Sequence, residues 1–317
     1  MITTREKQIY KVTAVGSVVN ILLTAFKFIA GILGRSSAMV ADAVHSLSDL
    51  LSDIIVVVFV RTASKPVDHT HEYGHGKFET LATLIVGCIL ILAGIGIMVA
   101  GIKDCIAFFH GEIGERPHII ALIAAVLSIV LKEGAFRYTF SRGRKINSPI
   151  LIANAMHHRS DVFSSVATLI GVAGALFLGQ KGIILDPLAA ILVSFLICKS
   201  GYEIVKPSID ELLEKSLSQE TEKEIRRILH SVPGIEGVHK LKTRKIGNEI
   251  AIEAHTEMDG KMSLEDAHCI ATEAENKLRE HFGSKTHVGI HMEPAEHQRG
   301  ATAARHHNDL RRQPADN

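Results

Sequence analysis

The stretch Met156–Asp161, MHHRSD, places two histidines, an arginine and an aspartate inside a segment that is otherwise long and apolar. SPILIANA precedes it at 148–155, and VFSSVATLIGVAGALFLG follows it at 162–179. An ionisable group at the centre of a membrane helix costs roughly 2.5–3.5 kcal/mol on insertion scales. Because ionisable residues at membrane depth are rare and usually have a function, we expect some of these polar side chains to be functional.

The rest of the N-terminal two thirds predicts a bundle of membrane-spanning helices. A segment of about 20 apolar residues is long enough to cross a bilayer. Such segments lie at about Val12–Leu33, Ser37–Val60, Leu81–Ile102, Ile119–Phe136, Leu151–Leu178 and Ile183–Tyr202. Lysines and arginines gather before the first segment, between the second and third, and between the fourth and fifth. By the positive-inside rule, we expect six spans, cytoplasmic N- and C-termini, and a multi-pass protein of the plasma (inner) membrane.

Composition agrees with a membrane part joined to a polar part. Of the 317 residues, 47% are hydrophobic and 22% are charged, and the formal net charge of +1 gives no reason to expect nucleic acid as a partner. The four cysteines show no CxxC spacing, so neither a disulfide framework nor a thiolate metal site is indicated. The 18 histidines are an unusual number, and imidazole is the commonest metal ligand.

After residue 206 the pattern changes to that of a small α+β domain. An amphipathic helix is predicted at 218–232, followed by alternating strands at 237–246 and 249–258, a second helix at 263–283 and a third strand at 287–294. This α-β-β-α-β order predicts a sheet with helices on one face. We therefore divide the chain into a six-helix transport domain at 1–206, a cytoplasmic domain at 207–296 and a disordered polar tail at 297–317.

Two His–Asp pairs at membrane depth predict a metal site. His45 and Asp49 lie four residues apart in the second span, as do His157 and Asp161 in the fifth, so each pair shares one helix face. Each pair alone could be a buried hydrogen bond between helices, but two copies in separate spans favour a site of two nitrogens and two oxygens, a tetrahedral set that suits Zn²⁺. Neighbouring His158 and Arg159 are expected to point elsewhere.

Two further clusters are candidates for metal binding. In the loop KPVDHTHEYGHGKFE, Asp68, His71 and His75 have short ligand spacing, with His69 as a spare donor. The alternative is a merely hydrophilic loop. In the α+β domain the period of two places His291 and Glu293 on one face of a strand. His239 and His255 lie on the preceding strands and His268 on the intervening helix, although surface histidines unrelated to metal are the alternative.

These motifs resemble the cation diffusion facilitators, a family of membrane transporters that export zinc and related divalent cations. The resemblance runs from about Lys11 to Pro294 and rests on SSAMVADAVHSLSDLLSD, KPVDHTHEYGHGKFE, KINSPILIANAMHHRSDVFSS and the α-β-β-α-β domain. It implies a homodimer in the lipid bilayer, a ferredoxin-like, metallochaperone-like cytoplasmic fold, and exchange of metal for protons by alternating access.

The resemblance also assigns roles to residues. It implies a transport site of His45, Asp49, His157 and Asp161, a loop site of Asp68, His71 and His75, and a dinuclear cytoplasmic site of His239, His255, His268, His291 and Glu293. The family more often has Asp where Glu293 stands. Lys77 matches a basic residue that pairs across the dimer with an acid after the sixth span, for which Asp210 and Glu214 are candidates.

Together these observations predict a secondary active transporter, not an enzyme. We expect a Zn²⁺/proton antiporter that also binds Zn²⁺ as a regulatory ligand; Cd²⁺, Fe²⁺, Co²⁺ or Mn²⁺ is a possible substrate because affinity order alone does not discriminate. Metal needs neutral imidazole and ionised carboxylate, so protons compete with it. The alternatives are a metallohydrolase, which needs an open coordination position that a set of four ligands would close, and a membrane-anchored metal sensor, which has no need of paired ligands inside two spans.

Overall fold

The fold was analysed in a computed structural model that describes residues 4–63, 65, 67–112, 114–145, 149–247 and 249–295. Within the helices, the side chains of Asp49, His157 and His158 lie outside this description, as does the tail predicted at 297–317. The chain divides into two compact units, Met1–Val58 with Ala82–Pro207, and Phe59–Leu81 with Ser208–Asn317. The loop between the second and third helices thus belongs with the α+β unit, and the domain limits inferred from sequence stay a prediction.

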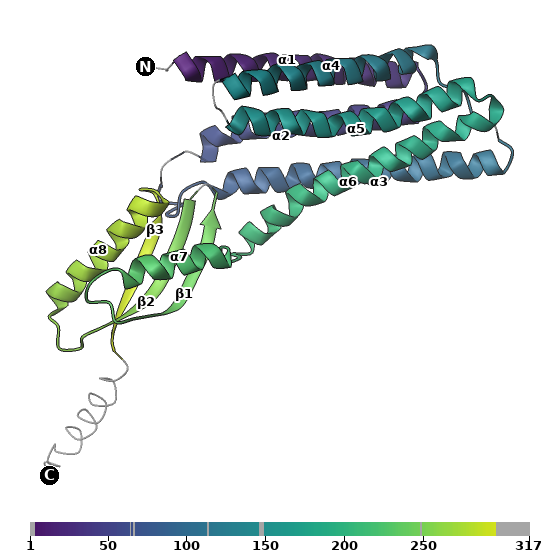
Figure 1. The fold of residues 1–317 in the computed structure, drawn as a ribbon. Coiled ribbons are helices and arrows are strands. Elements are labelled where there is room, and N and C mark those ends of the chain that lie inside the picture. The colour runs from purple at the N-terminus through teal and green to yellow at the C-terminus, as the bar shows by residue number, and fades with distance from the viewer. Residues whose placement is uncertain are drawn as a thin grey trace, which may run out of the picture. The chain divides into compact units, whose positions relative to one another are not determined.

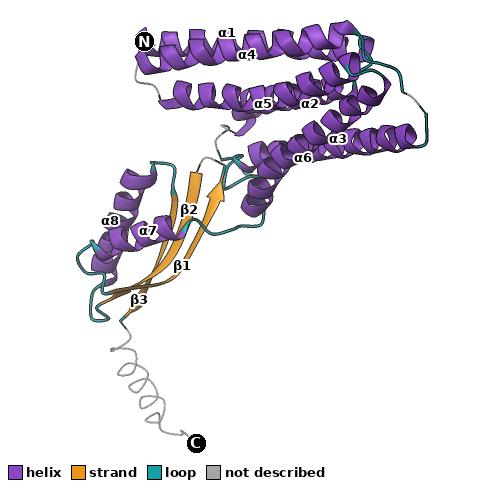
Figure 2. Cartoon of the chain, turned by 45° about the vertical axis from the view of Figure 1, so that its right-hand side comes forward, coloured by secondary structure: helices purple, strands orange, loops and turns teal. Residues whose placement is uncertain are grey.

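Six long helices dominate the first unit (Figure 1). They are α1 (Thr4–Leu33), α2 (Ser37–Ala63), α3 (Lys77–Phe109), α4 (Ile119–Lys145), α5 (Pro149–Phe177) and α6 (Leu185–Leu212), with the 3₁₀ turn η1 (Gln180–Ile184) before α6. In both Figures 1 and 2, α1 lies beside α4, α2 beside α5 and α3 beside α6. The predicted spans fall on these helices, and α3 and α4 extend well beyond the apolar segments.

Four stretches among the described residues are long and apolar enough to cross a membrane: Gly16–Leu33, Lys77–Phe109, Ile119–Lys145 and Gln180–Leu212. In α5 the described apolar stretch, Asp161–Phe177, is shorter. Large apolar side chains such as Leu22, Leu92 and Phe195 point outward, whereas the buried core between the helices is rich in alanine. Small interior residues with apolar residues outside are typical of helices packed within lipid.

Close approach of α3 and α6 depends on glycine. Gly87, Gly94 and Gly101 recur every seventh residue of α3, and a Cβ added at these positions would lie 2.6, 2.7 and 2.9 Å from side-chain atoms of Val205, Cys198 and Ile191 of α6. Real Cβ atoms do not come this close, so any larger residue would push the helices apart. The glycine stripe therefore sets the spacing of this helix pair.

The second unit contains the predicted α-β-β-α-β order as α7 (Gln219–His230), β1 (Gly237–Ile246), β2 (Glu249–Met258), α8 (Leu264–Phe282) and β3 (His287–Pro294). The sheet order is β1-β2-β3, with β1 antiparallel and β3 parallel to β2. Helices α7 and α8 cover one face (Figure 2), and residues such as Leu229, Ile252 and Leu278 form the core between helices and sheet. Ser218 and Ser263 accept backbone N–H bonds at the two helix starts, as predicted for Ser263. The predicted fold class is confirmed.

Candidate metal sites

The candidate transport site is on the facing sides of α2 and α5. Thr168 Oγ1 of α5 lies 3.4 Å from the Ala38 carbonyl oxygen of α2, and Ser164 Oγ donates to Asp42 Oδ1 at 3.0 Å. From the first contact to the second, the residue number rises by four on α2 and falls by four on α5. The two helices are therefore antiparallel, and their facing residues follow one constant register. Continued for two further turns, this register sets His45 opposite Asp161, and then Asp49 opposite His157.

The described members of this site are withdrawn from solvent. The exposed fraction is 8% for His45 and 5% for Asp161, and the Nδ1 atom of His45 has no hydrogen-bond partner among the described residues. A buried imidazole nitrogen without a partner is unusual and is available to a metal ion. The side chains of Asp49 and His157 lie outside the described residues, so the four-ligand set stays a prediction.

A buried ion-pair network surrounds these residues and was not predicted. Lys27 of α1 is fully buried; its Nζ lies 2.7 Å from Asp42 Oδ2 and donates to Ser46 Oγ at 2.9 Å and to Ser165 Oγ at 3.2 Å. The hydroxyl groups of Ser165 and Ser128 are 3.1 Å apart, which adds α4 to the network. Asp42 is therefore part of a junction of four helices.

Lys132 of α4 also faces the interior. Its Nζ lies 3.6 Å from Asp161 Oδ2, and the side chain of Lys132 is 4% exposed. Consecutive residues of a helix point in different directions, so the adjacent Glu133 does not share this position. Glu133 instead pairs with the exposed Arg137, with Oε1 2.7 Å from its Nε. Arg159, predicted not to be a ligand, lies over the ring of Phe136.

The start of α2 is fixed by a carboxylate from α6. Ser36 Oγ donates to Asp186 Oδ1 at 2.6 Å, and the backbone N–H of Ser37 donates to Oδ2 at 2.7 Å. Ser36 Oγ in turn accepts from the N–H of Met39 at 3.1 Å. A carboxylate is favourable at a helix N-terminus because it satisfies free N–H groups and complements the helix dipole. Asp186 therefore sets the axial position of the helix that carries His45.

We expect Asp186→Asn to loosen the first turn of α2. The amide nitrogen cannot accept the Ser37 N–H bond, so about 1–3 kcal/mol of local stability should be lost. Hydrogen exchange of the Ser37 and Ala38 amides should then be faster in the variant. Asp104→Asn is the matched control, because the hydrogen bond described for Asp104 is a long one, 3.4 Å, from the Ser37 hydroxyl and not from the backbone. Unchanged exchange in Asp186→Asn would contradict the capping role.

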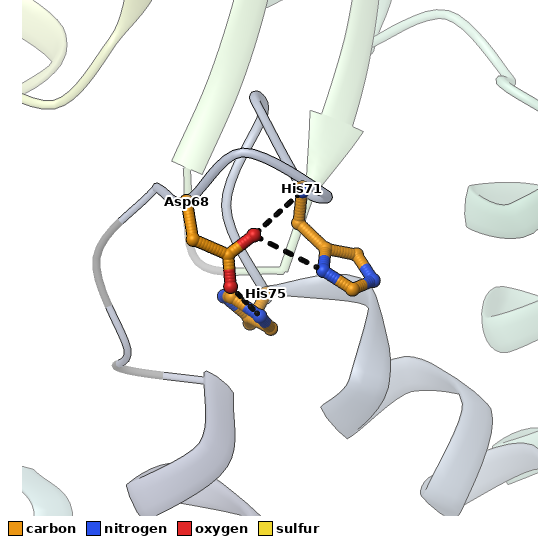
Figure 3. A group of neighbouring side chains, drawn as sticks. All are labelled: Asp68, His71 and His75. Atoms are coloured by element: carbon orange, nitrogen blue, oxygen red, sulfur yellow. Dashed lines mark hydrogen bonds and ion pairs between the residues drawn. The ribbon is translucent and has the colours of Figure 1, made fainter.

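The loop cluster converges as its spacing predicted (Figure 3). One ligand atom from each of Asp68, His71 and His75 lies within 4.8 Å of the others. Asp68 Oδ1 is 3.4 Å from His71 Nδ1, and Oδ2 is 3.3 Å from His75 Nε2. Hydrogen bonds from the hydroxyl and N–H of Thr70 and the N–H of His71 hold the pKa of Asp68 well below its usual range. Asp68 is thus an ionised ligand at any physiological pH.

This loop is fastened to the β1–β2 turn within its own unit. A Cβ added at Gly76 would lie 2.8 Å from the Ile246 carbonyl oxygen, so only glycine fits there. Glu211 accepts from both Thr80 Oγ1, at 2.6 Å, and Gly247 N, at 2.8 Å. His75 is 7% exposed, and its Nδ1 has no hydrogen-bond partner among the described residues. The loop geometry is therefore held by contacts outside the cluster.

Lys77 forms an ion pair with Glu214 of the same chain, and Glu214 also meets Arg244 Nε at 3.0 Å. Asp210 pairs with Lys215, at 2.5 Å. The pairing of Lys77 across a dimer, expected from the family resemblance with Asp210 or Glu214 as the acid, stays a prediction. The contacts described in one chain favour Glu214 as the acid that reaches Lys77.

The third cluster lies in one row across the sheet. His239 of β1 is opposite His255 of β2, which is opposite His291 of β3. Glu293 meets all three: Oε1 lies 2.6 Å from His255 Nδ1 and 3.6 Å from His291 Nε2, and Oε2 lies 3.1 Å from His239 Nε2. Since Ile252 and Ala254 belong to the core under the helices, alternation places His255 on the sheet's other face.

The same alternation separates His268 from this group and adds a residue. His268 is exposed on α8 and is not among the described groups whose ligand atoms converge. Glu257, two residues after His255 and therefore on its face, has Oε1 3.4 Å from His239 Nδ1. The alternation that places His291 and Glu293 on one face of β3 also places His255 and Glu257 on one face of β2. The bulge between His239 and Lys242 shifts the register at this end of β1.

We expect Glu293→Gln to weaken metal binding at the sheet cluster by about a hundredfold or more, since replacing even an outer-shell partner typically costs 10–100-fold. The amide lacks the negative charge that all three histidines face. When the metal-free full-length proteins are titrated with metal, Glu293→Gln should lack one class of tight binding site that wild type has. Glu253→Gln, on β2 and on the same face of the sheet, is the matched control, because Glu253 pairs with Arg244 instead, at 3.1 Å. An equal loss in both variants would contradict the assignment.

A helical unit with stretches apolar enough to cross a membrane, joined to an α+β unit with clusters of histidine and carboxylate side chains, is typical of a metal-cation transporter. Comparison with known proteins agrees. Residues 13–213 match the family model described as the cation efflux transmembrane domain, and residues 217–295 match the cation efflux protein cytoplasmic domain. The chain belongs to the cation diffusion facilitator family.

Several curated proteins are similar along most of the chain. The manganese efflux system protein MneP of Bacillus subtilis is 32% identical over 298 residues, which cover 93% of this chain and 99% of the relative. Metal tolerance protein C1 of Arabidopsis thaliana is 33% identical over 90% of this chain and 62% of the relative. The magnetosome protein MamB of a Magnetospira species is 31% identical over 86% of this chain and 91% of the relative.

Membership of this family makes the chain a multi-pass membrane transporter that exports divalent cations. The prediction that it is not an enzyme is confirmed, and the metallohydrolase alternative is wrong. The cytoplasmic domain is of the type named for its role in dimers, which fits the expected homodimer.

Proposed function

We propose that this protein exports Zn²⁺ from the cytosol in exchange for protons, through a site formed by His45, Asp49, His157 and Asp161. The observation that carries the proposal is the antiparallel register of α2 and α5, which supports one His–Asp pair facing the other. His45 and Asp161, the two described members, are buried as a transport site at membrane depth requires.

The donor set supports zinc, whereas one group of relatives supports manganese. Two imidazole nitrogens and two carboxylate oxygens suit Zn²⁺ and tolerate Cd²⁺, Co²⁺ or Fe²⁺. Two carboxylates also offer hard ligands, and the B. subtilis relative is named as a manganese efflux system protein. Mn²⁺ is therefore the second candidate substrate.

Protons are the proposed counter-ion because they compete with metal for the same four side chains. A bound divalent cation needs ionised carboxylates and neutral imidazoles, so protons arriving from the outer side favour release. Rocking of α2 and α5 would expose the site to the two sides of the membrane in turn. The proposed orientation, with both termini in the cytoplasm of a plasma membrane, follows from the distribution of lysine and arginine between the predicted spans.

The loop and sheet clusters are proposed regulatory sites for Zn²⁺. Their donors suit a metal: Asp68 with His71 and His75, and His239 and His255 with Glu293, each have ligand atoms within 4.8 Å of one another. A bound ion would supply the positive charge that draws the carboxylate and imidazoles of each cluster together. Two protomers are proposed to associate through the cytoplasmic domain.

Metal flux into vesicles reconstituted with the purified full-length protein tests the function. An imposed pH gradient, acid in the compartment that receives metal, should drive uptake of Zn²⁺, and a gradient of opposite sign should slow it. Parallel measurements with Mn²⁺, Cd²⁺ and Fe²⁺ should rank Zn²⁺ first by kcat/KM. Metal uptake that does not respond to the pH gradient would contradict proton exchange, and a higher kcat/KM for Mn²⁺ would make manganese the substrate.

A further inference from the structure

Two lysines are buried among the helices of the first unit, and they have different surroundings. An ammonium group has three N–H donors. Lys27 has a partner for each of them, because Asp42, Ser46 and Ser165 all lie between 2.7 and 3.2 Å from its Nζ. Such a complete set of short contacts is typical of a fixed structural ion pair.

Lys132 is buried with far less support. Its Nζ has no hydrogen-bond partner among the described residues, and its one described ion pair, to Asp161 Oδ2, is 3.6 Å long. A buried ammonium without hydrogen bonds is costly, since it has given up its hydration and regained only Coulomb attraction. The structure thus keeps Lys132 in a position that stability alone does not favour, directly beside a carboxylate of the candidate transport site.

We propose that the Lys132 ammonium is the resident cation of the transport site: it neutralises Asp161 while the site is empty, and an arriving divalent cation displaces it. This role rests on the proposed function of Asp161 as a metal ligand. The long and flexible lysine side chain allows the ammonium to leave the carboxylate without movement of the backbone. A contact at 3.6 Å without a hydrogen bond is easily broken, whereas the Lys27 contacts are not.

Two consequences follow from a tethered cation at this position. It lowers the affinity for metal and thereby speeds release on the far side, which a transporter needs as much as binding. It also favours divalent over monovalent ions, because Na⁺ or K⁺ offers Asp161 no more charge than the ammonium already supplies. Lys132 would thus be a specificity-determining residue that does not itself bind the metal.

Metal uptake kinetics in vesicles with the full-length protein test this role, with Zn²⁺ and Mn²⁺ measured separately. Lys132→Met keeps the length of the side chain and removes its charge. We expect its KM to fall by about tenfold or more, because a like charge beside the ion has been removed, and kcat to fall as release slows. Lys132→Arg, which keeps the charge, should return both constants toward wild type.

Arg137→Met is the matched control, since it removes one positive charge from the exposed side of the same helix and should change neither constant. If Lys132→Met does not fold, Lys132→Gln is measured instead.

If Lys132 has only a structural role, kcat of Lys132→Met should fall while KM is unchanged or raised. That result would overturn the proposal. Asp161→Asn separates the two levels of inference. Wild-type uptake in Asp161→Asn would overturn the proposed transport site itself, whereas an inactive Asp161→Asn with an unchanged KM in Lys132→Met would overturn only the role of Lys132.

Discussion

Cation flux should fall to the background of protein-free vesicles in both Asp161→Ala and Asp49→Ala. Each substitution removes one of the two carboxylates that are proposed to balance the charge of a bound divalent cation, so we expect a loss of at least about a hundredfold in kcat/KM. In Asp161→Ala the effect has a second cause, because the Lys132 ammonium keeps its charge and loses the carboxylate 3.6 Å away. The measurement is initial metal uptake under the favourable pH gradient.

Glu133→Gln is the matched control for these variants. Glu133 is a carboxylate of the neighbouring helix α4 that meets the exposed Arg137, so it carries the same charge as the substituted residues but lies outside the proposed site. Its flux should equal that of wild type. Unchanged flux in Asp49→Ala and Asp161→Ala would contradict the proposed transport site. Equal losses in these two variants and in Glu133→Gln would show a general effect of lost negative charge.

Patterns within one element predicted most of the fold. The alternation at 249–258 and the helix start at Ser263 predicted β2 and α8, and apolar length predicted the membrane helices. The loop cluster was also predictable, because Asp68, His71 and His75 are close in sequence and the loop needs only to turn on itself. Local spacing is sufficient where the partners belong to one segment.

Pairings between elements were not predictable in this way. Asp186 caps a helix that begins about 150 residues earlier, and Lys27 bonds to Ser165, 138 positions away. Spacing on one helix gives the face on which a residue lies but not the residue opposite. The sequence therefore gives no signal that Asp161 is the partner of Lys132. Within the sheet, the alternation that places His255 on the polar face also places Glu257 there, whereas the position of His268 on α8 depends on which face of the sheet the helix covers.

The second large effect is expected on stability, in Lys27→Met. This substitution leaves Asp42 fully buried, and its remaining hydrogen bonds among the described residues come from the hydroxyl groups of Ser164 and Ser165. Removing one partner of a buried ion pair typically costs 3–5 kcal/mol because the other charge remains uncompensated. We expect the purified full-length protein to lose its monodisperse state at a clearly lower temperature than wild type.

The double variant Lys27→Met/Asp42→Asn gives the decisive comparison. Replacing both charges by neutral groups of similar size is often nearly neutral, so most of the lost stability should return. Recovery would identify the uncompensated carboxylate as the cause, whereas an equally unstable double variant would point to lost packing around Lys27. A Lys27→Met protein as stable as wild type would contradict the ion pair itself. Lys132→Met should differ from Lys27→Met, because loss of the loosely held Lys132 ammonium should affect KM more than stability. The two buried lysines would then have separate roles: Lys27 holds four helices together, and Lys132 competes with the metal ion for the site.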